Sequence, residues 1–168
     1  GKKWETTMTN TSEIIIGSLS YIWHLIPIII FIILLKRFIS TRDNKKRKRQ
    51  NEENEKNGLT LELRTIKRYE DLGYKVVSNK IQNENIDMIC YKDDKTILVK
   101  CKNSFDSKSI KEEDIVAFYD DAIKYINANN IKEKNAVFRY AVPYKDIFHK
   151  SAIKILDDDY YNCKYILV

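Results

Sequence analysis

The stretch NIDMICYKDDKTILVKCK, residues 85–102, decides the fold of this chain. Two runs within it, residues 86–91 and 96–102, are rich in β-branched and other apolar residues. They flank a short polar segment at 92–95, and this arrangement is typical of a β-hairpin. The sequence therefore predicts two antiparallel strands joined by a tight turn.

The register of this hairpin brings charged residues together. If the chain turns symmetrically about Asp93 and Asp94, paired residues have numbers with a constant sum, and Asp87 lies directly opposite Lys100. Side chains alternate between the two faces of a strand, so Lys102 lies on the same face as Lys100. One acid and two lysines are thus expected on one surface patch. A change of one residue in the loop would destroy this register.

Helices and strands alternate around the hairpin. Apolar residues at helical spacing predict three helices, at 59–72, 109–128 and 144–156. Gly73 would cap the end of the first helix, and Ser109, which has capping-box spacing, would begin the second. Apolar β-rich runs predict strands at 74–77, 136–142 and 164–168. We expect an α/β domain at 58–168, with a mixed sheet flanked by helices.

Length and charge limit the functional classes. The chain has 168 residues, enough for one ordinary domain and an appendage. Its net charge is +6, but residues 36–49 alone hold eight basic residues against a single acid. Residues 50–168 are close to neutral, so DNA binding by the domain requires a local basic patch.

The cysteines indicate a reducing compartment. Cys90, Cys101 and Cys163 are far apart, odd in number and not arranged as a CxxC pair. Two of them lie within apolar strand patterns, where a free cysteine is usually a small buried hydrophobe. We expect neither a disulfide framework nor a zinc site.

Residues 14–35 predict a single transmembrane helix after a short N-terminal tail at 1–13. The apolar run has about the length that crosses a bilayer, and Lys36 and Arg37 follow it directly. A signal peptide is the alternative, but that segment would be shorter and would end in a small-residue cleavage site. The positive-inside rule predicts a single-pass membrane protein with its C-terminal domain in the cytoplasm.

Residues 36–57 are expected to be a basic juxtamembrane segment followed by a linker. The run at 45–49, KKRKR, suits a topology signal next to the span. Attraction of anionic lipid and of nucleic acid are alternative roles. Residues 50–57 are polar without periodicity, which is typical of a linker.

Residues 59–102 resemble the Mrr-like branch of the PD-(D/E)xK restriction-endonuclease superfamily. The resemblance rests on four pieces in order: Glu62 on a leading helix, LGYKV at 72–76, IDMI at 86–89 and ILVKCKN at 97–103. The later helix and the strand at 136–142 agree with the rest of that core. The fold implied is a restriction-endonuclease-like mixed sheet over residues 58–168.

The resemblance also implies an activity, the hydrolysis of DNA phosphodiester bonds with Mg²⁺ or Mn²⁺. Asp87 matches the metal-binding aspartate, Glu62 the auxiliary metal-binding acid and Lys102 the catalytic lysine. Hard carboxylate oxygens suit Mg²⁺, and a nearby lysine can orient the attacking water and offset charge on the phosphate. DNA is the expected partner. Dimers are common in this fold, and the sequence leaves a homodimer open.

Lys100 departs from the pattern, because its position usually holds glutamate, aspartate or glutamine. A protonated lysine offers no oxygen to a metal. Backbone, water and Glu62 could complete the metal shell, or an acid of the next helix, Glu112 or Asp114, could replace the lost ligand. Alternatively the site no longer cleaves.

Three readings of the domain therefore remain open. The lead is a membrane-anchored endonuclease, and the alternative is a catalytically inactive nuclease-fold domain that binds DNA or a protein partner at the membrane surface. A structural anchor whose domain only mediates assembly is the third. For Asp87 and Lys100 alone, an ordinary cross-strand ion pair is the simplest explanation.

Overall fold

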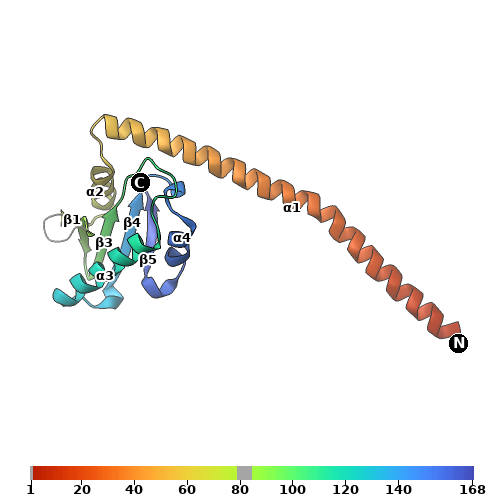
Figure 1. Ribbon diagram of the computed structural model, residues 1–168. Coiled ribbons are helices and arrows are strands. Elements are labelled where there is room, and N and C mark those ends of the chain that lie inside the picture. The colour runs from red at the N-terminus through yellow and green to blue at the C-terminus, as the bar shows by residue number, and fades with distance from the viewer. Residues whose placement is uncertain (1, 79–84) are drawn as a thin grey trace. The chain divides into compact units, whose positions relative to one another are not determined.

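The computed structural model describes residues 2–78 and 85–168. The chain divides into two compact units, Gly1–Asp43 and Asn44–Val168. Helix α1, Lys2–Lys56, belongs to both units (Figure 1). The part of α1 from Ser20 onward is long and apolar enough to cross a membrane. A signal sequence near the N-terminus can have the same length and composition.

Helix α1 differs from the segments expected around the apolar run. It begins at Lys2, so residues expected to form a tail are helical. It ends at Lys56, so the segment expected to be a linker forms the last turns of the helix. The side chain of Asn51 in these turns is buried, with 2 % exposed. The sequence did not indicate this helical conformation, because a buried polar side chain adds no apolar periodicity.

The second unit is an α/β domain with a five-stranded mixed sheet. The strands lie side by side in the order β1-β2-β3-β4-β5. The first three are antiparallel, and β3–β4 and β4–β5 are parallel. The bounds are β1 Lys75–Ser78, β2 Met88–Lys92, β3 Lys95–Cys101, β4 Ala136–Val142 and β5 Cys163–Leu167. The predicted fold class is thereby confirmed as a mixed α/β sheet with flanking helices.

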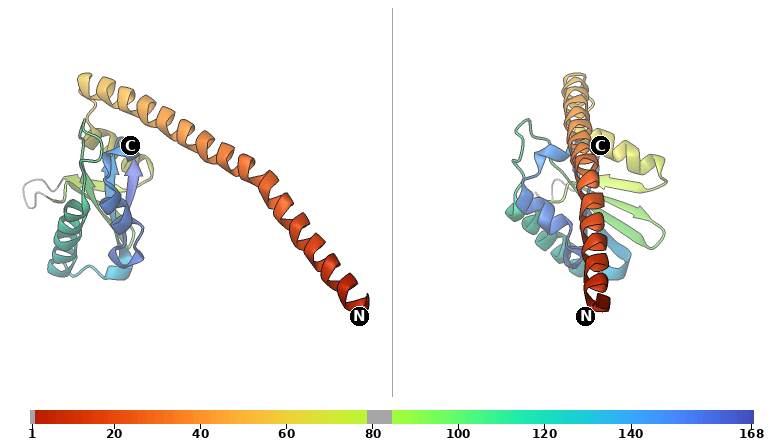
Figure 2. Two further views of the ribbon diagram at one scale, coloured as in Figure 1. Left: turned by 45° about the vertical axis from the view of Figure 1, so that its right-hand side comes forward. Right: turned by 90° about the vertical axis from the view of Figure 1, so that its right-hand side faces the viewer.

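Three α-helices cover the two faces of the sheet (Figures 1 and 2). They are α2 Leu61–Asp71, α3 Glu112–Ala128 and α4 Lys150–Leu156. One apolar core packs α3 and α4 against side chains such as Ile89 and Leu98. The other packs α2 against Cys90, Val99 and Cys101. The alternation of β3 residues between the two cores is the period-2 pattern of a strand buried on both faces.

Local signals explain the ends of α2 and the hairpin. The Thr60 side chain accepts a hydrogen bond from the Leu63 amide and caps the start of α2. Gly73 has φ of +90°, the left-handed conformation that the predicted cap requires. Asp93 also has a positive φ, 52°, in the tight turn that joins β2 to β3.

Two helix predictions were wrong at their N-terminal ends, for one shared reason. Ile110 forms a parallel bridge with Phe148, which holds both segments extended. Helix α3 therefore starts at Glu112 rather than at Ser109, and the Asp114 carboxylate accepts a hydrogen bond from the Lys111 amide. The helix expected at 144–156 divides into a 3₁₀ turn, Lys145–Ile147, and α4.

Candidate functional site

Asp87 and Lys100 meet as the hairpin register predicts. Met88 pairs with Val99 in the β2–β3 ladder, and Asp87 stands just before β2. The backbone amide of Asp87 donates to the Val99 carbonyl at 2.9 Å. The Nζ of Lys100 lies 3.7 Å from Oδ2 of Asp87. The predicted neighbours are therefore an ion pair at the end of the hairpin.

The carboxylate of Asp87 is held firmly. Its Oδ2 accepts a hydrogen bond from the Cys101 amide at 2.6 Å, in addition to the contact with Lys100. Asp87 is 9 % exposed, and the Lys100 side chain is 19 % exposed. Hydrogen bonds to an ionised acceptor are short and strong, so this contact fixes the carboxylate at the end of β3.

Lys102 follows β3 directly, and its side chain is exposed. Its backbone amide donates to the Ala141 carbonyl of β4 at 3.0 Å, which extends the parallel pairing by one residue. Alternation puts Lys102 on the same face of the strand as Lys100. The backbone of the lysine is thus anchored to the sheet while its ammonium group faces solvent, where it can meet a phosphate or a water.

Glu62 lies near the end of β3. It lies in the first turn of α2 and lines a hollow of about 260 Å³ together with Cys101 and Asn103. Burial raises the pKa of the Cys101 thiol to about 12, and the negative charges of Asp87 and Glu62 add to that shift. The charges of both predicted metal-binding acids therefore reach the Cys101 thiol.

The acids of α3 differ in their surroundings. The Asp114 carboxylate caps its own helix, as described above, and Glu112 is exposed. Tyr140 is the β4 residue paired with Lys100. Burial raises the pKa of the Tyr140 hydroxyl, and the charges of Asp114 and Asp87 raise it further. Of the two substitutes considered for the missing metal ligand, Asp114 is the one whose charge reaches the same buried tyrosine as Asp87.

The residues do not form a ready-made metal cage. Among the side chains that the structure describes, no group of three or more His, Cys, Asp or Glu could hold a metal ion. Mg²⁺ commonly uses only one or two carboxylates, with waters and substrate phosphates completing its shell. Asp87 and Glu62 fit that pattern only if Lys100 withdraws from Asp87, because the ammonium group takes the position of a cation at Oδ2.

Sequence reasoning missed a polar network beside this site. The network joins the end of α1 to the start of α2 and to the residue after Lys102. Its members are Asn51 and Glu55 of α1, Arg64 of α2, and Asn103. Glu55 also lines the hollow that contains Glu62. The only available signal was the spacing of four between Asn51 and Glu55, which puts both on one helical face.

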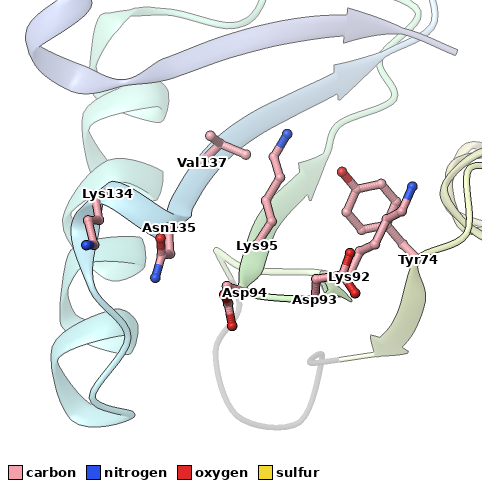
Figure 3. Close-up of a pocket in the computed structure, with 8 residues that line it drawn as sticks. All are labelled: Tyr74, Lys92, Asp93, Asp94, Lys95, Lys134, Asn135 and Val137. Carbon is pink, nitrogen blue, oxygen red and sulfur yellow. The ribbon is translucent and has the colours of Figure 1, made fainter.

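A second hollow lies at the opposite end of the hairpin (Figure 3). Its volume is about 490 Å³, and Lys92, Lys95 and Lys134 line it with Asp93 and Asp94. Figure 3 shows Lys92 and Lys95 extending from the hairpin, with Lys134 across the hollow. The Nζ of Lys92 donates to the Leu72 carbonyl at 2.9 Å, so this lysine also holds the end of α2. The hollow is an open basic surface and lacks the buried acid beside lysines that the Asp87 end has.

No protein-family model matches the chain, and no curated protein matches it. The candidate site is therefore defined by its own geometry.

Proposed function

We propose that this chain is a membrane-anchored, Mrr-like endonuclease that hydrolyses DNA phosphodiester bonds with a divalent metal. The observation that carries the proposal is the hairpin register, which joins Asp87 to Lys100 and puts Lys102 two residues further along the chain. The order of helices and strands, with a parallel β3–β4 pair after the hairpin, supports the same reading.

Each residue has a role in this proposal. Asp87, with Glu62, would hold Mg²⁺ or Mn²⁺, which supplies Lewis-acid stabilisation of the phosphate. Lys102 orients or deprotonates the attacking water and offsets the charge that develops on the phosphate. Its exposed side chain on an anchored backbone suits this role. Lys100 must leave Asp87 before the carboxylate can serve a metal, and a DNA phosphate is a natural competing anion for it.

A second function is favoured by one specific contact. The ion pair of 3.7 Å between Lys100 and Asp87 already neutralises the acid that a metal would need. If that pair persists on DNA, the domain binds the phosphate backbone through exposed lysines such as Lys102 and Lys108 and does not cleave it. The domain is then a DNA tether at the membrane.

The location proposed is the inner membrane, with residues 14–35 within α1 as the single span and the α/β domain in the cytoplasm. The length and composition of α1 support it, and so does the basic run that follows its apolar part. Resistance to carbonate extraction would separate a span from a removed signal sequence. Protease protection of the domain in inverted and right-side-out vesicles would test its orientation.

Supercoiled plasmid is the substrate that tests the activity. The full chain in detergent micelles is incubated with plasmid and Mg²⁺ or Mn²⁺, beside the Asp87→Asn and Lys102→Ala variants. The nuclease proposal expects metal-dependent nicking or linearisation that both variants abolish. DNA binding without cleavage by the wild type supports the tether, and neither binding nor cleavage refutes both. Light scattering of the chain in detergent measures whether it forms the homodimer that the sequence leaves open.

A further inference from the structure

The last turns of α1 are bound to the segment that follows β3. The side chains of Asn51 and Asn103 exchange hydrogen bonds of 2.9 and 3.2 Å, although the two residues are 52 positions apart in the sequence. The Nδ2 of Asn103 also donates to Oε1 of Glu55 at 2.7 Å. Two side chains of the helix thus hold the residue next to Lys102.

The same helix end is tied to α2. Oε1 of Glu55 accepts a hydrogen bond from the Leu61 amide at 2.9 Å, and the Arg64 guanidinium donates to Oδ1 of Asn51 at 2.7 Å. Burial lowers the pKa of Arg64, and the charge of Glu55 opposes that shift. Asn51 is almost fully buried, so its side-chain amide forms hydrogen bonds with these partners instead of with water. The network fixes the last turns of α1, the start of α2 and Asn103 relative to one another.

A second contact acts on the next residue of the same segment. The Nζ of Lys48 lies 5.7 Å from the centroid of the Tyr144 ring, and the Tyr144 hydroxyl donates to the Ser104 carbonyl at 2.7 Å. Lys48 belongs to the basic run for which a topology role was expected. The helix therefore contacts Asn103 directly and Ser104 through Tyr144, and these are the two residues that follow Lys102.

We propose that Asn51 and Glu55 are positioning residues for Lys102. They hold the strand end so that the lysine side chain, itself exposed and flexible, starts from a fixed backbone. This inference rests on the proposed function and extends the functional unit into α1, the helix that also contains the candidate span. The nuclease domain then begins near Asn44, where the second compact unit begins, and not at residue 58.

The first test measures hydrogen exchange in the full chain in detergent. The Asn51→Ala variant should increase exchange at the Lys102 amide at least about fivefold, because the support of the strand end is lost. Asn54→Ala is the matched control, since Asn54 lies in the same helix turns and its side chain bonds the exposed Gln50. Glu55→Gln, which keeps an acceptor oxygen, should restore most of the protection that Glu55→Ala loses. Unchanged exchange in Asn51→Ala and Glu55→Ala would overturn the inference, whether or not the protein cleaves DNA.

The second test measures cleavage kinetics. Asn51→Ala should lower kcat about 10- to 100-fold with KM changed less than about threefold, as expected for a misplaced catalytic group. Ile126→Val controls for stability, because it shortens a buried side chain of α3 and should leave kcat unchanged. If Ile126→Val has the same thermal stability as Asn51→Ala and lowers kcat by the same factor, the effect of Asn51→Ala comes from lost stability alone. That result would overturn the proposal. If the wild type cleaves no DNA while exchange at Lys102 responds as expected, the proposed nuclease function fails and the positioning of the strand end stands.

Discussion

Replacing Lys100 with glutamine should convert the Asp87 end of the hairpin into a better metal site. The Lys100 ammonium lies 3.7 Å from the Asp87 carboxylate, and both side chains are largely buried. A divalent ion must displace this ammonium group and then tolerate its positive charge nearby. Glutamine removes the charge and supplies a carbonyl oxygen, which is a suitable ligand for Mg²⁺ or Mn²⁺.

The separation of the two charges sets the expected magnitude. At 3.7 Å and an effective dielectric constant of about 20, the gross attraction is about 4.5 kcal/mol. Desolvation of the two groups offsets most of it, and we take about 1–2 kcal/mol as the net cost of separating them. Each 1.4 kcal/mol corresponds to a tenfold change in affinity. Because the repulsion between lysine and metal also disappears, Lys100→Gln should bind Mn²⁺ about 10- to 100-fold more tightly than the wild type.

Titration calorimetry with Mn²⁺ on the full chain in detergent measures this change. Lys95→Gln is the matched control, because Lys95 lies on the same strand at its other end and is exposed. The control should bind Mn²⁺ as the wild type does. Equal Mn²⁺ affinity in Lys100→Gln and the wild type would refute the argument that Lys100 competes with the metal. Tighter binding that survives a further Asp87→Asn change would locate the metal elsewhere.

Other perturbations have equally definite expected results. Thermal unfolding should show that Asp87→Asn lowers the unfolding free energy by about 2 kcal/mol and the Tm by about 5–10 °C. The double variant Asp87→Asn with Lys100→Gln should lose less unfolding free energy than the two single variants lose together, because the two side chains interact. Lys102→Ala should leave the Tm within about 2 °C while abolishing plasmid cleavage, because the replaced side chain is exposed. Burial raises the pKa of each of the three cysteine thiols to about 12, from an ordinary value of 9.0, so the folded state keeps protons that the unfolded state releases. Stability should therefore be full below pH 9 and fall above it by up to about 1.4 kcal/mol per pH unit for each thiol, which denaturant midpoints at pH 8 and 10.5 would measure.

The sequence predicted the hairpin and its register because both depend on local chemistry. Asp93 adopts the positive φ that a tight turn needs, and the apolar runs on each side are long enough to fix the pairing. Strand β4 was predicted at its observed bounds, since Pro143 stops it. The neighbouring positions of Asp87 and Lys100 followed from the register alone.

The wrong predictions all involve partners distant in sequence. Ser109 had the spacing of a helix cap, but the bridge between Ile110 and Phe148 keeps that segment extended. The residues expected to form a linker contain Asn51 and Glu55, whose partner Asn103 is about 50 positions away. A polar residue buried against a polar partner has the same local pattern as one in solvent, so only the tertiary structure distinguishes the two cases.

The rate of plasmid cleavage at saturating DNA, in the presence of Mn²⁺, decides whether this domain is an endonuclease that uses Lys102. The wild-type chain and Lys102→Ala are compared at equal DNA occupancy, measured by fluorescence anisotropy. We expect metal-dependent cleavage by the wild type and a loss of at least about 100-fold in the variant, whose DNA affinity stays within a few-fold. Full occupancy of DNA with no cleavage by the wild type, or equal cleavage by the two proteins, would show that the domain is not a nuclease of this kind.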